Sequence, residues 1–226
     1  MTTSHRIALL AGATGVVGAH ILQALLDDPG VATVHALCRK PLAIQHPKLQ
    51  VHLVDFAHLP ALPALPAAHE AYLALGTTIK DAGSQDAFRA VDLHMNLAVA
   101  QAALAAGARR IGVVSAVDAN PGAGAFYNRV KGELEAALKA LPLDALVIAQ
   151  PSLLLDDRRR VGQRTRIGEV IAIPLAKVVA PLLPGRYRPV YGQAVAQALV
   201  RALPQATGLR VLPSDVMAQG SQTHAR

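Results

Sequence analysis

Residues 6–18 read RIALLAGATGVVG, an apolar run that leads into three glycines at positions 12, 15 and 18. The unbroken apolar stretch at 7–11 indicates a β-strand that is covered on both faces. The residues after the first glycines have the apolar spacing of a helix, which we predict over 17–27. A strand, a glycine-rich turn and a helix in this order are typical of a segment that binds a dinucleotide.

The glycines of such a turn have separate tasks. The first allows the tight turn, the second lets backbone N–H groups approach a pyrophosphate, and the third lets the helix pack closely on the strand. The N-terminus of the helix also favours a bound anion. We therefore assign to this phosphate loop the residues Gly12, Ala13, Thr14, Gly15, Val16, Val17 and Gly18. The alternative is a glycine-rich turn that binds no ligand.

Short apolar runs and longer helical patterns alternate along the rest of the chain. We predict strands over 6–11, 33–38, 50–54, 71–75, 110–114, 145–149 and 209–212, and helices over 17–27, 84–106, 125–140, 168–175 and 193–203. This alternation predicts an α/β protein with a Rossmann-type, doubly wound parallel sheet in a single domain over 1–213. Residues 152–188 are expected to cap the cofactor site, and the polar residues 214–226 to form a disordered tail.

The composition excludes several classes of protein. The chain has 226 residues, of which 52% are hydrophobic, so it can bury one core of ordinary domain size. No apolar run reaches the roughly 18 residues of a membrane-spanning helix, and the glycines interrupt the N-terminal run too early for a signal peptide. A single cysteine, Cys38, excludes an intramolecular disulfide and favours a cytoplasmic location. The net charge of +7 favours anionic partners.

The end of the second predicted strand indicates which nicotinamide cofactor is bound. An NAD site usually has an acidic residue about 20 residues beyond the glycines, but this strand ends in Cys38, Arg39 and Lys40. The Arg39 guanidinium suits a 2′-phosphate, with Lys40 as a supporting charge, so we expect NADP(H) rather than NAD(H). The alternative is a pair of solvated cations. Asp55, Phe56, Leu75, Gly76 and Thr77 follow the next two strands and are expected to line the cofactor site.

Three residues form a candidate catalytic group. Tyr127 and Lys131 are four residues apart, which places them on one face of a helix. A phenol with an ordinary pKa of about 10 needs a nearby cation to exchange protons near neutral pH, and Lys131 could supply it. Ser115, at the end of the preceding strand, is expected to orient the oxygen of the substrate. The alternative is an exposed Tyr–Lys pair and a serine that only ends a strand.

These motifs together resemble the atypical short-chain dehydrogenases, and more narrowly the branch that contains the human Tat-interacting protein. The resemblance rests on the glycine loop, the sequences LGTT at 75–78, YNRVKGE at 127–133 and PSLL at 151–154, and Ser115. It implies a Rossmann fold with bound NADP(H). It also implies that both Tyr127 and Lys131 take part in binding this cofactor. By analogy with that family, Pro151, Ser152 and Leu153 border the nicotinamide.

The chain departs from this family at two positions. Relatives often have a second serine after the strand-end serine, where this chain has Ala116. They also frequently have an arginine before the proline that follows the sixth strand, where this chain has Gln150. The first departure puts the orientation of the substrate in doubt, and the second removes one cation near the cofactor.

Our leading hypothesis is an NADP-dependent short-chain dehydrogenase/reductase, an oxidoreductase that transfers a hydride to a small carbonyl substrate or takes one from the alcohol. The alternatives are an NADPH-binding regulatory protein with little or no catalysis, and a nucleotide-sugar-type epimerase. Scattered histidines predict no metal site, and aromatic residues at only 3% argue against nucleic-acid binding. We interpret the basic run at 158–166 as a solvated loop, with an anionic substrate as the alternative. A homodimer would be indicated by an exposed apolar face on the helix at 84–106.

Overall fold

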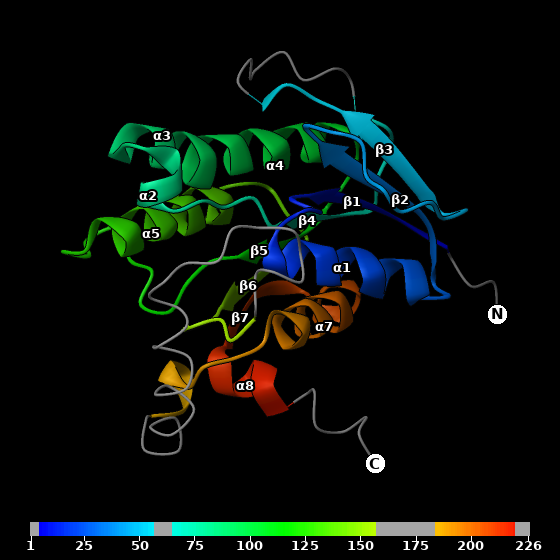
Figure 1. Cartoon of the computed structure of the whole chain (residues 1–226). Helices are drawn as coiled ribbons and strands as arrows, with labels where there is room; N and C mark the ends of the chain where they lie inside the picture. Colours follow the sequence, from blue (N-terminus) through cyan, green and yellow to red (C-terminus); the bar gives the residue numbers. More distant parts are fainter. Residues whose placement is uncertain (1–4, 57–64, 157–183, 220–226) are drawn as a thin grey trace.

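The computed structural model describes residues 5–56, 65–156 and 184–219. Its centre is a seven-stranded sheet in which every pair of neighbouring strands is parallel (Figure 1). The order along the sheet is β3-β2-β1-β4-β5-β6-β7. The strands are β1 (Arg6–Ala11), β2 (Val31–Cys38), β3 (Leu49–Leu53), β4 (Glu70–Leu73), β5 (Arg110–Val114), β6 (Ala145–Gln150) and β7 (Gly208–Pro213). The predicted doubly wound parallel sheet is confirmed.

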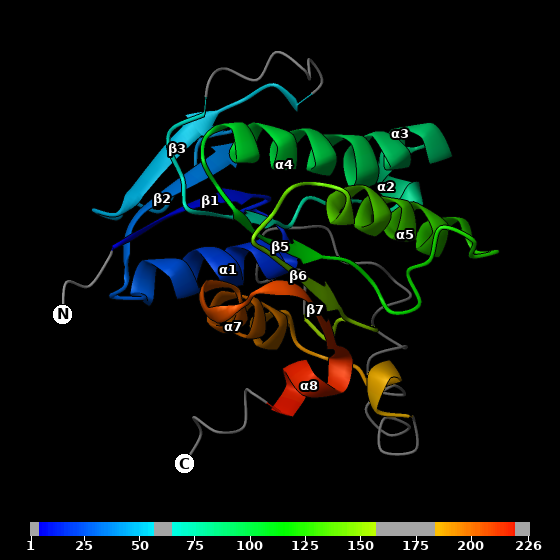
Figure 2. The same cartoon turned by 180° about the vertical axis from the view of Figure 1, so that it is seen from behind.

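Helices cover both faces of the sheet (Figures 1 and 2). One layer contains α1 (Val16–Asp27) and α7 (Gly192–Ala202), and the other contains α3 (Gln85–Arg89), α4 (Asn96–Ala105) and α5 (Phe126–Lys139). Each layer forms its own apolar core with the sheet. In β1, Leu10 packs in the core beneath α1 and α7, whereas its neighbour Leu9 packs in the core beneath α4 and α5. This alternation explains why the strand is apolar at successive positions.

The helix predicted at 84–106 is divided by a π-helical turn. This turn, η2 (Ala90–Met95), lies between α3 and α4. Two short elements complete this part of the chain order: α2 (Ile79–Ala82) comes before α3, and the 3-10 turn η6 (Leu203–Gln205) comes after α7. Within the described residues, 84–106 carries no large hydrophobic side chain that is exposed. The homodimer therefore gains no support from this helix and stays a prediction.

The C-terminal tail is more ordered than its composition predicted. Residues Ser214–Gln219 form α8, in which Ser214 and Met217 are fully buried. The Ser214 hydroxyl accepts a hydrogen bond from the backbone N–H of Ser152 at 2.8 Å, and Met217 packs in the core beside α7. The expectation of a disordered tail from residue 214 is thus wrong for 214–219, because one buried methionine and one buried hydroxyl attach this segment to the domain.

Several predictions lie outside the described residues. These are the helix at 168–175, the basic run at 158–166, most of the capping segment at 152–188 and the end of the tail at 220–226. The described end of the capping segment contains the 3-10 turn η5 (Gly185–Tyr187). Across the described part of the chain, no helix is long and apolar enough to cross a membrane.

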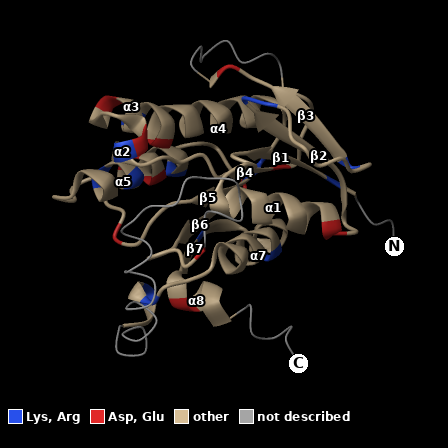
Figure 3. Ribbon diagram, in the orientation of Figure 1, with Lys and Arg blue, Asp and Glu red and all other residues tan. Residues whose placement is uncertain are grey.

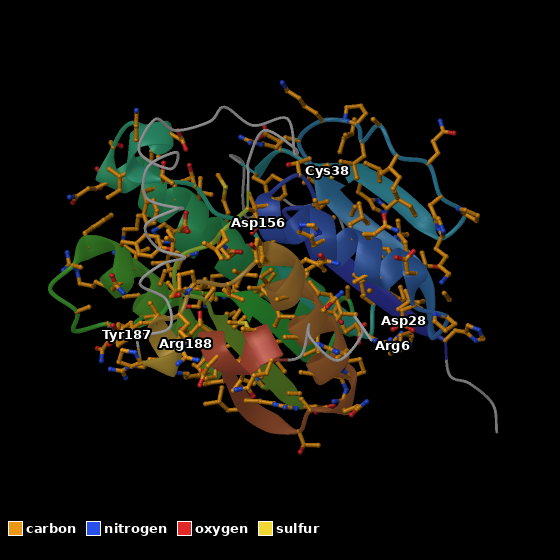
Figure 4. All side chains as sticks on the ribbon, turned by 60° about the horizontal axis from the view of Figure 1, so that its bottom comes forward. Arg6, Asp28, Cys38, Asp156, Tyr187 and Arg188 are labelled. Carbon is orange, nitrogen blue, oxygen red and sulfur yellow. The ribbon has the colours of Figure 1, made fainter. Side chains whose placement is uncertain are left out.

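A buried charge network lies at the amino end of the central strand β1. Glu70, which is 1% exposed, accepts hydrogen bonds from Arg6 Nη1 at 2.6 Å and from the Tyr72 hydroxyl at 3.1 Å. Arg6 also pairs with Asp28 (Figure 4). In the same view Cys38 lies at the far end of β2, which is the end of the sheet where the glycine loop lies. The network therefore stabilises the opposite end of the strands from the candidate site.

Candidate functional site

The candidate site lies at the carboxyl ends of β1 and β4. The chain runs outward from β1 to β2 and β3 on one side, and from β4 to β7 on the other. Strand order therefore reverses between β1 and β4, and open α/β sheets bind ligands at such a point. The phosphate loop follows β1, and residues 75–78 follow β4.

The glycine loop is too closely packed for side chains at two of its positions. Gly12 has a φ of +97°, and a Cβ atom there would lie 2.4 Å from the carbonyl oxygen of Ala74. A Cβ atom at Gly18 would lie 1.9 Å from the carbonyl oxygen of Gly12. The loop is closed by a hydrogen bond of 2.9 Å from the Gly15 N–H to that same oxygen. Glycine is thus required sterically here, as the fingerprint predicted.

The start of α1 is suited to a phosphate group. Gly15 is the N-cap residue and supplies no side-chain hydrogen bond to the helix, and the first turn carries no acidic residue. Backbone N–H groups of the first turn of a helix have no partner within the helix. They and the helix dipole attract an anion, so the loop fits the diphosphate of a dinucleotide.

Two adjoining pockets extend from this loop in opposite directions. The first, of about 300 Å³, reaches the end of β2, and the second, of about 180 Å³, reaches β5 and α5. They share Gly15, Ala74, Leu75, Gly76 and Thr77. Together they form a continuous depression across the carboxyl edge of the sheet, as an extended dinucleotide requires.

The pockets bring together most of the residues singled out in the sequence. The first is lined by Gly12, Ala13, Thr14, Arg39, Asp55 and Phe56, and the second by Val16, Val17, Ser115, Tyr127, Lys131, Pro151 and Ser152. Three other candidates do not line them. Lys40 is exposed beyond the first pocket, Gly18 is covered by the loop, and Leu153 is 45% exposed while Leu154 lines the second pocket in its place.

Ser115 is bound to a carboxylate that the sequence reasoning missed. Its hydroxyl is 3% exposed and donates a hydrogen bond of 2.5 Å to Oε1 of Glu135. The same oxygen accepts a hydrogen bond of 2.9 Å from Gln150 Nε2, and Oε2 lies 3.5 Å from Lys139 Nζ. The serine hydrogen is thus directed at Glu135, which leaves its oxygen lone pairs for the pocket. Gln150 stands where relatives frequently have an arginine, and in this chain it is a neutral donor that holds the carboxylate of Glu135.

We expect Glu135→Ala to lower the free energy of unfolding by about 1 to 3 kcal/mol, because it leaves the buried Ser115 hydroxyl and the half-buried Gln150 amide without their acceptor. Glu135→Gln should cost less, since an amide oxygen can still accept one of these hydrogen bonds. Urea denaturation of both variants and the parent measures the difference. Equal losses in the two variants would show that the hydrogen bonds of Glu135 contribute little.

Lys131 pairs with Asp92 rather than with the phenol that the sequence suggested. Its Nζ lies 2.7 Å from Oδ1 of Asp92 and 6.0 Å from the centre of the Tyr127 ring. Lys131 and Asp92 are both buried, whereas Tyr127 is 40% exposed. Burial alone would lower the pKa of Lys131, but the nearby Asp92, Tyr127 and Glu135 raise it above its ordinary value. Lys131 is therefore held as an ammonium.

The π-helical turn η2 carries Asp92 into the site and is held there by Asn96. The Asn96 amide nitrogen donates to the carbonyl oxygens of Val91 and Asp92, both at 3.2 Å, and of Leu75 at 3.1 Å. Asp92 Oδ2 accepts a hydrogen bond of 2.9 Å from the Thr77 N–H. In the sequence Asp92 and Asn96 are two of several polar residues in 84–106, and only their burial in the structure distinguishes them. Acidic and basic segments lie close together around α2 and α5 in Figure 3.

The described residues contain no group of three or more His, Cys, Asp or Glu side chains that could hold a metal ion.

Comparisons with known proteins agree with the fold and the glycine loop. Residues 12–179 match the model of a family described as NAD(P)H-binding. Protein FMP52, mitochondrial, of Eremothecium gossypii is 34% identical over 198 residues, which cover 85% of this chain and 86% of that protein. Protein HTATIP2 of Rattus norvegicus is 30% identical over 172 residues, which cover 74% of this chain and 69% of that protein.

A solved structure, MoeE5 in complex with UDP-glucose and NAD, has the same fold. Its TM-score is 0.66 at 18% identity, and the match covers 91% of this chain and 74% of that chain. The relatives also correct one expectation. The cytoplasmic location inferred from the single cysteine is contradicted, because FMP52 relatives from several fungi are named mitochondrial proteins.

Proposed function

Because the chain belongs to the NAD(P)H-binding family, in the Tat-interacting-protein-like branch of the atypical short-chain dehydrogenases, we propose that it is an NADP(H)-dependent oxidoreductase that reduces a small carbonyl compound. The observation that supports this most strongly is the convergence of Ser115, Tyr127 and Lys131 on one pocket, which adjoins the glycine loop. A dinucleotide on the loop would place its nicotinamide end in that pocket.

The chain's own residues supply the proton and hold the reactants. A bound NADPH supplies the hydride that reduces the carbonyl carbon. Tyr127 donates its hydroxyl proton to the carbonyl oxygen, which completes the alcohol, and the exposed side of the phenol regains a proton from water. Lys131 would donate hydrogen bonds to the ribose of a bound cofactor, and Ser115 offers its oxygen as an acceptor to the hydroxyl of the product alcohol. In the reverse direction Tyr127 takes the proton from the alcohol.

Arg39 supports NADP(H) as the cofactor. It follows β2 and lines the pocket at the adenosine end, where Asp55 and Phe56 also lie. A guanidinium binds a phosphate group through two parallel hydrogen bonds, which are among the stronger ones in proteins. The neighbouring Lys40 is exposed and does not line this pocket. We therefore assign the 2′-phosphate to Arg39 alone.

We expect Arg39→Ala to weaken NADPH binding about 10- to 100-fold, which corresponds to about 1.5 to 3 kcal/mol for hydrogen bonds to a charged group. NADH binding should change little, because NADH has no 2′-phosphate. Calorimetric titration with both nucleotides measures this, with Lys40→Ala as the matched control that keeps its NADPH affinity. If neither nucleotide binds the parent protein, the proposed function is wrong. If both variants lose affinity equally, the assignment to Arg39 is wrong.

A dinucleotide-binding regulator with little or no catalysis is a second candidate. Ala116 replaces the second serine of the family pattern, and the one remaining serine already donates its proton to Glu135. A screen of carbonyl substrates distinguishes the two functions: turnover that Tyr127→Phe abolishes supports the reductase, and NADPH binding without turnover supports the regulator. A nucleotide-sugar epimerase gains no added support, because the likeness to MoeE5 at 18% identity extends to the fold alone.

A further inference from the structure

Burying a lysine side chain costs free energy unless its charge is paired with an opposite charge. Moving an ammonium group out of water favours its neutral form, and buried lysines can lose their proton several pH units below the ordinary value. The Lys131 side chain is only 5% exposed, and Nζ has a carboxylate oxygen of Asp92 at 2.7 Å. Asp92 is itself 1% exposed. The two charges therefore depend on each other.

Other ionisable groups face Lys131 from two elements. Asp92 approaches from η2, while Tyr127 and Glu135 lie one turn before and one turn after Lys131 on α5 itself. Glu135 already accepts hydrogen bonds from Ser115 and Gln150 and lies near Lys139. Tyr127 places its ring, 6.0 Å away, beside the ammonium. Among the described residues, Asp92 is thus the carboxylate that pairs directly with Nζ.

We propose that Asp92 is a positioning residue, whose carboxylate keeps the buried Lys131 charged and holds its ammonium at the cofactor side of the second pocket. This inference rests on the proposed function for its biological meaning, because only a bound dinucleotide gives the ammonium something to hold.

Asp92 is fixed well enough for this task. One of its oxygens binds Lys131, and the other accepts the N–H of Thr77, which belongs to the segment after β4 that both pockets share. Asn96 binds the backbone carbonyl oxygens of Asp92 and of Leu75 on the same segment. The carboxylate thus connects α5 to the lining of the cofactor site. An ammonium has three N–H donors, so Lys131 can stay paired with Asp92 and still donate hydrogen bonds to ligand hydroxyls.

The charge state of Lys131 can be measured directly. In protein with isotopically labelled lysine, the NMR signal of each side chain reports its own titration, and Lys131→Met identifies the signal of Lys131. We expect Asp92→Asn to lower the titration midpoint of Lys131 by about 2 pH units or more, since burial then acts without compensation. Asp92→Glu should restore much of the parent midpoint. An unchanged midpoint in Asp92→Asn would overturn the proposal.

Glu135→Gln is the matched control, because it neutralises the other carboxylate that faces Lys131. We expect it to shift the Lys131 midpoint by less than Asp92→Asn does. A larger shift in Glu135→Gln would assign the charge compensation to Glu135 and overturn the role of Asp92. The titration is performed without nucleotide, so its result does not depend on NADPH binding. A failure of the proposed function would appear in calorimetry and a failure of this inference in the NMR titration.

A second measurement keeps the proposal testable if Asp92→Asn does not fold. Lys131→Met leaves Asp92 buried without a counter-charge, whereas Lys131→Met combined with Asp92→Asn removes both charges. We expect the urea midpoint of the double variant to lie above that of Lys131→Met, because the unpaired carboxylate is gone. A double variant that is no more stable than Lys131→Met would show that the two side chains are not coupled and would overturn the proposal.

Discussion

Gly18→Ala is expected to weaken nucleotide binding and to destabilise the fold. The new Cβ atom would lie 1.9 Å from the carbonyl oxygen of Gly12, which is part of the phosphate loop's backbone. Neither atom can move alone, because Gly18 is in α1 and Gly12 is packed against the residues that follow β4. Forcing extra volume into such a contact costs about 1 to 3 kcal/mol. A displaced loop should weaken NADPH binding about 10- to 100-fold.

The matched control is Gly124→Ala, because a Cβ atom at Gly124 meets nothing within 4 Å. This variant should keep the stability and NADPH affinity of the parent protein. Urea denaturation and calorimetric titration measure both quantities for the three proteins. Parent-like binding by Gly18→Ala would contradict the loop geometry described above.

Arg6→Met is expected to lower the free energy of unfolding by about 3 kcal/mol near neutral pH. It leaves Glu70 buried without its counter-charge, and breaking a buried ion pair in this way typically costs about 3 to 5 kcal/mol. We expect the lower end of this range, because the Arg6 side chain is 21% exposed and water can partly replace it. Methionine retains much of the apolar volume of arginine, so lost packing contributes little.

The loss in Arg6→Met should depend on pH in a defined direction. Burial raises the pKa of Glu70 above its ordinary value of 4.5, although Arg6 opposes this shift. A carboxyl group with a raised pKa in the folded state contributes stability below its unfolded pKa, and this contribution is lost as pH rises through the folded pKa. Without Arg6, the pKa of Glu70 in the folded state is raised further. The loss in the free energy of unfolding that Arg6→Met causes should therefore be small near about pH 4 and reach its full size near about pH 7.

Urea midpoints of both proteins at the two pH values measure this difference. Adding Glu70→Gln to Arg6→Met removes the titrating group, so the pH dependence of the difference should disappear. Arg109→Met is the control for the loss of an arginine, because Arg109 is exposed and should give a midpoint near that of the parent. A difference of the same size at both pH values would show that lost packing, and not the buried charge, destabilises Arg6→Met.

The fold could be predicted because its determinants are local in sequence. The apolar run, the glycines at 12, 15 and 18, and the alternation of strand and helix patterns each act within a short stretch. The boundaries of α5 and β5 agree with their predicted ranges within one residue. The Tyr127–Lys131 spacing placed both residues at one pocket for the same reason.

The polar supports of the site could not be predicted because they depend on contacts between distant elements. Asp92 acquires its role only when η2 packs against α5 and the segment after β4, and Glu135 acquires its role only when α5 covers the ends of β5 and β6. In the sequence, Glu135 is one more acidic residue on an amphipathic helix. The order of 214–219 was missed for the same reason, since a short polar segment shows no period that reveals one buried methionine.

The π-helical turn also restricts how the length of this chain can vary. A π turn contains one residue more than an α-helical turn, so a single deletion within Ala90–Met95 would let the helix continue as a regular α-helix. Each residue of an α-helix rotates the chain by about 100°. A deletion between Asp92 and Asn96 would thus turn Asp92 away from Lys131 without changing any side chain. Loops usually tolerate insertions and deletions. Among relatives that keep the Asp92–Lys131 ion pair, we expect no insertion or deletion within the segment that corresponds to Ala90–Met95.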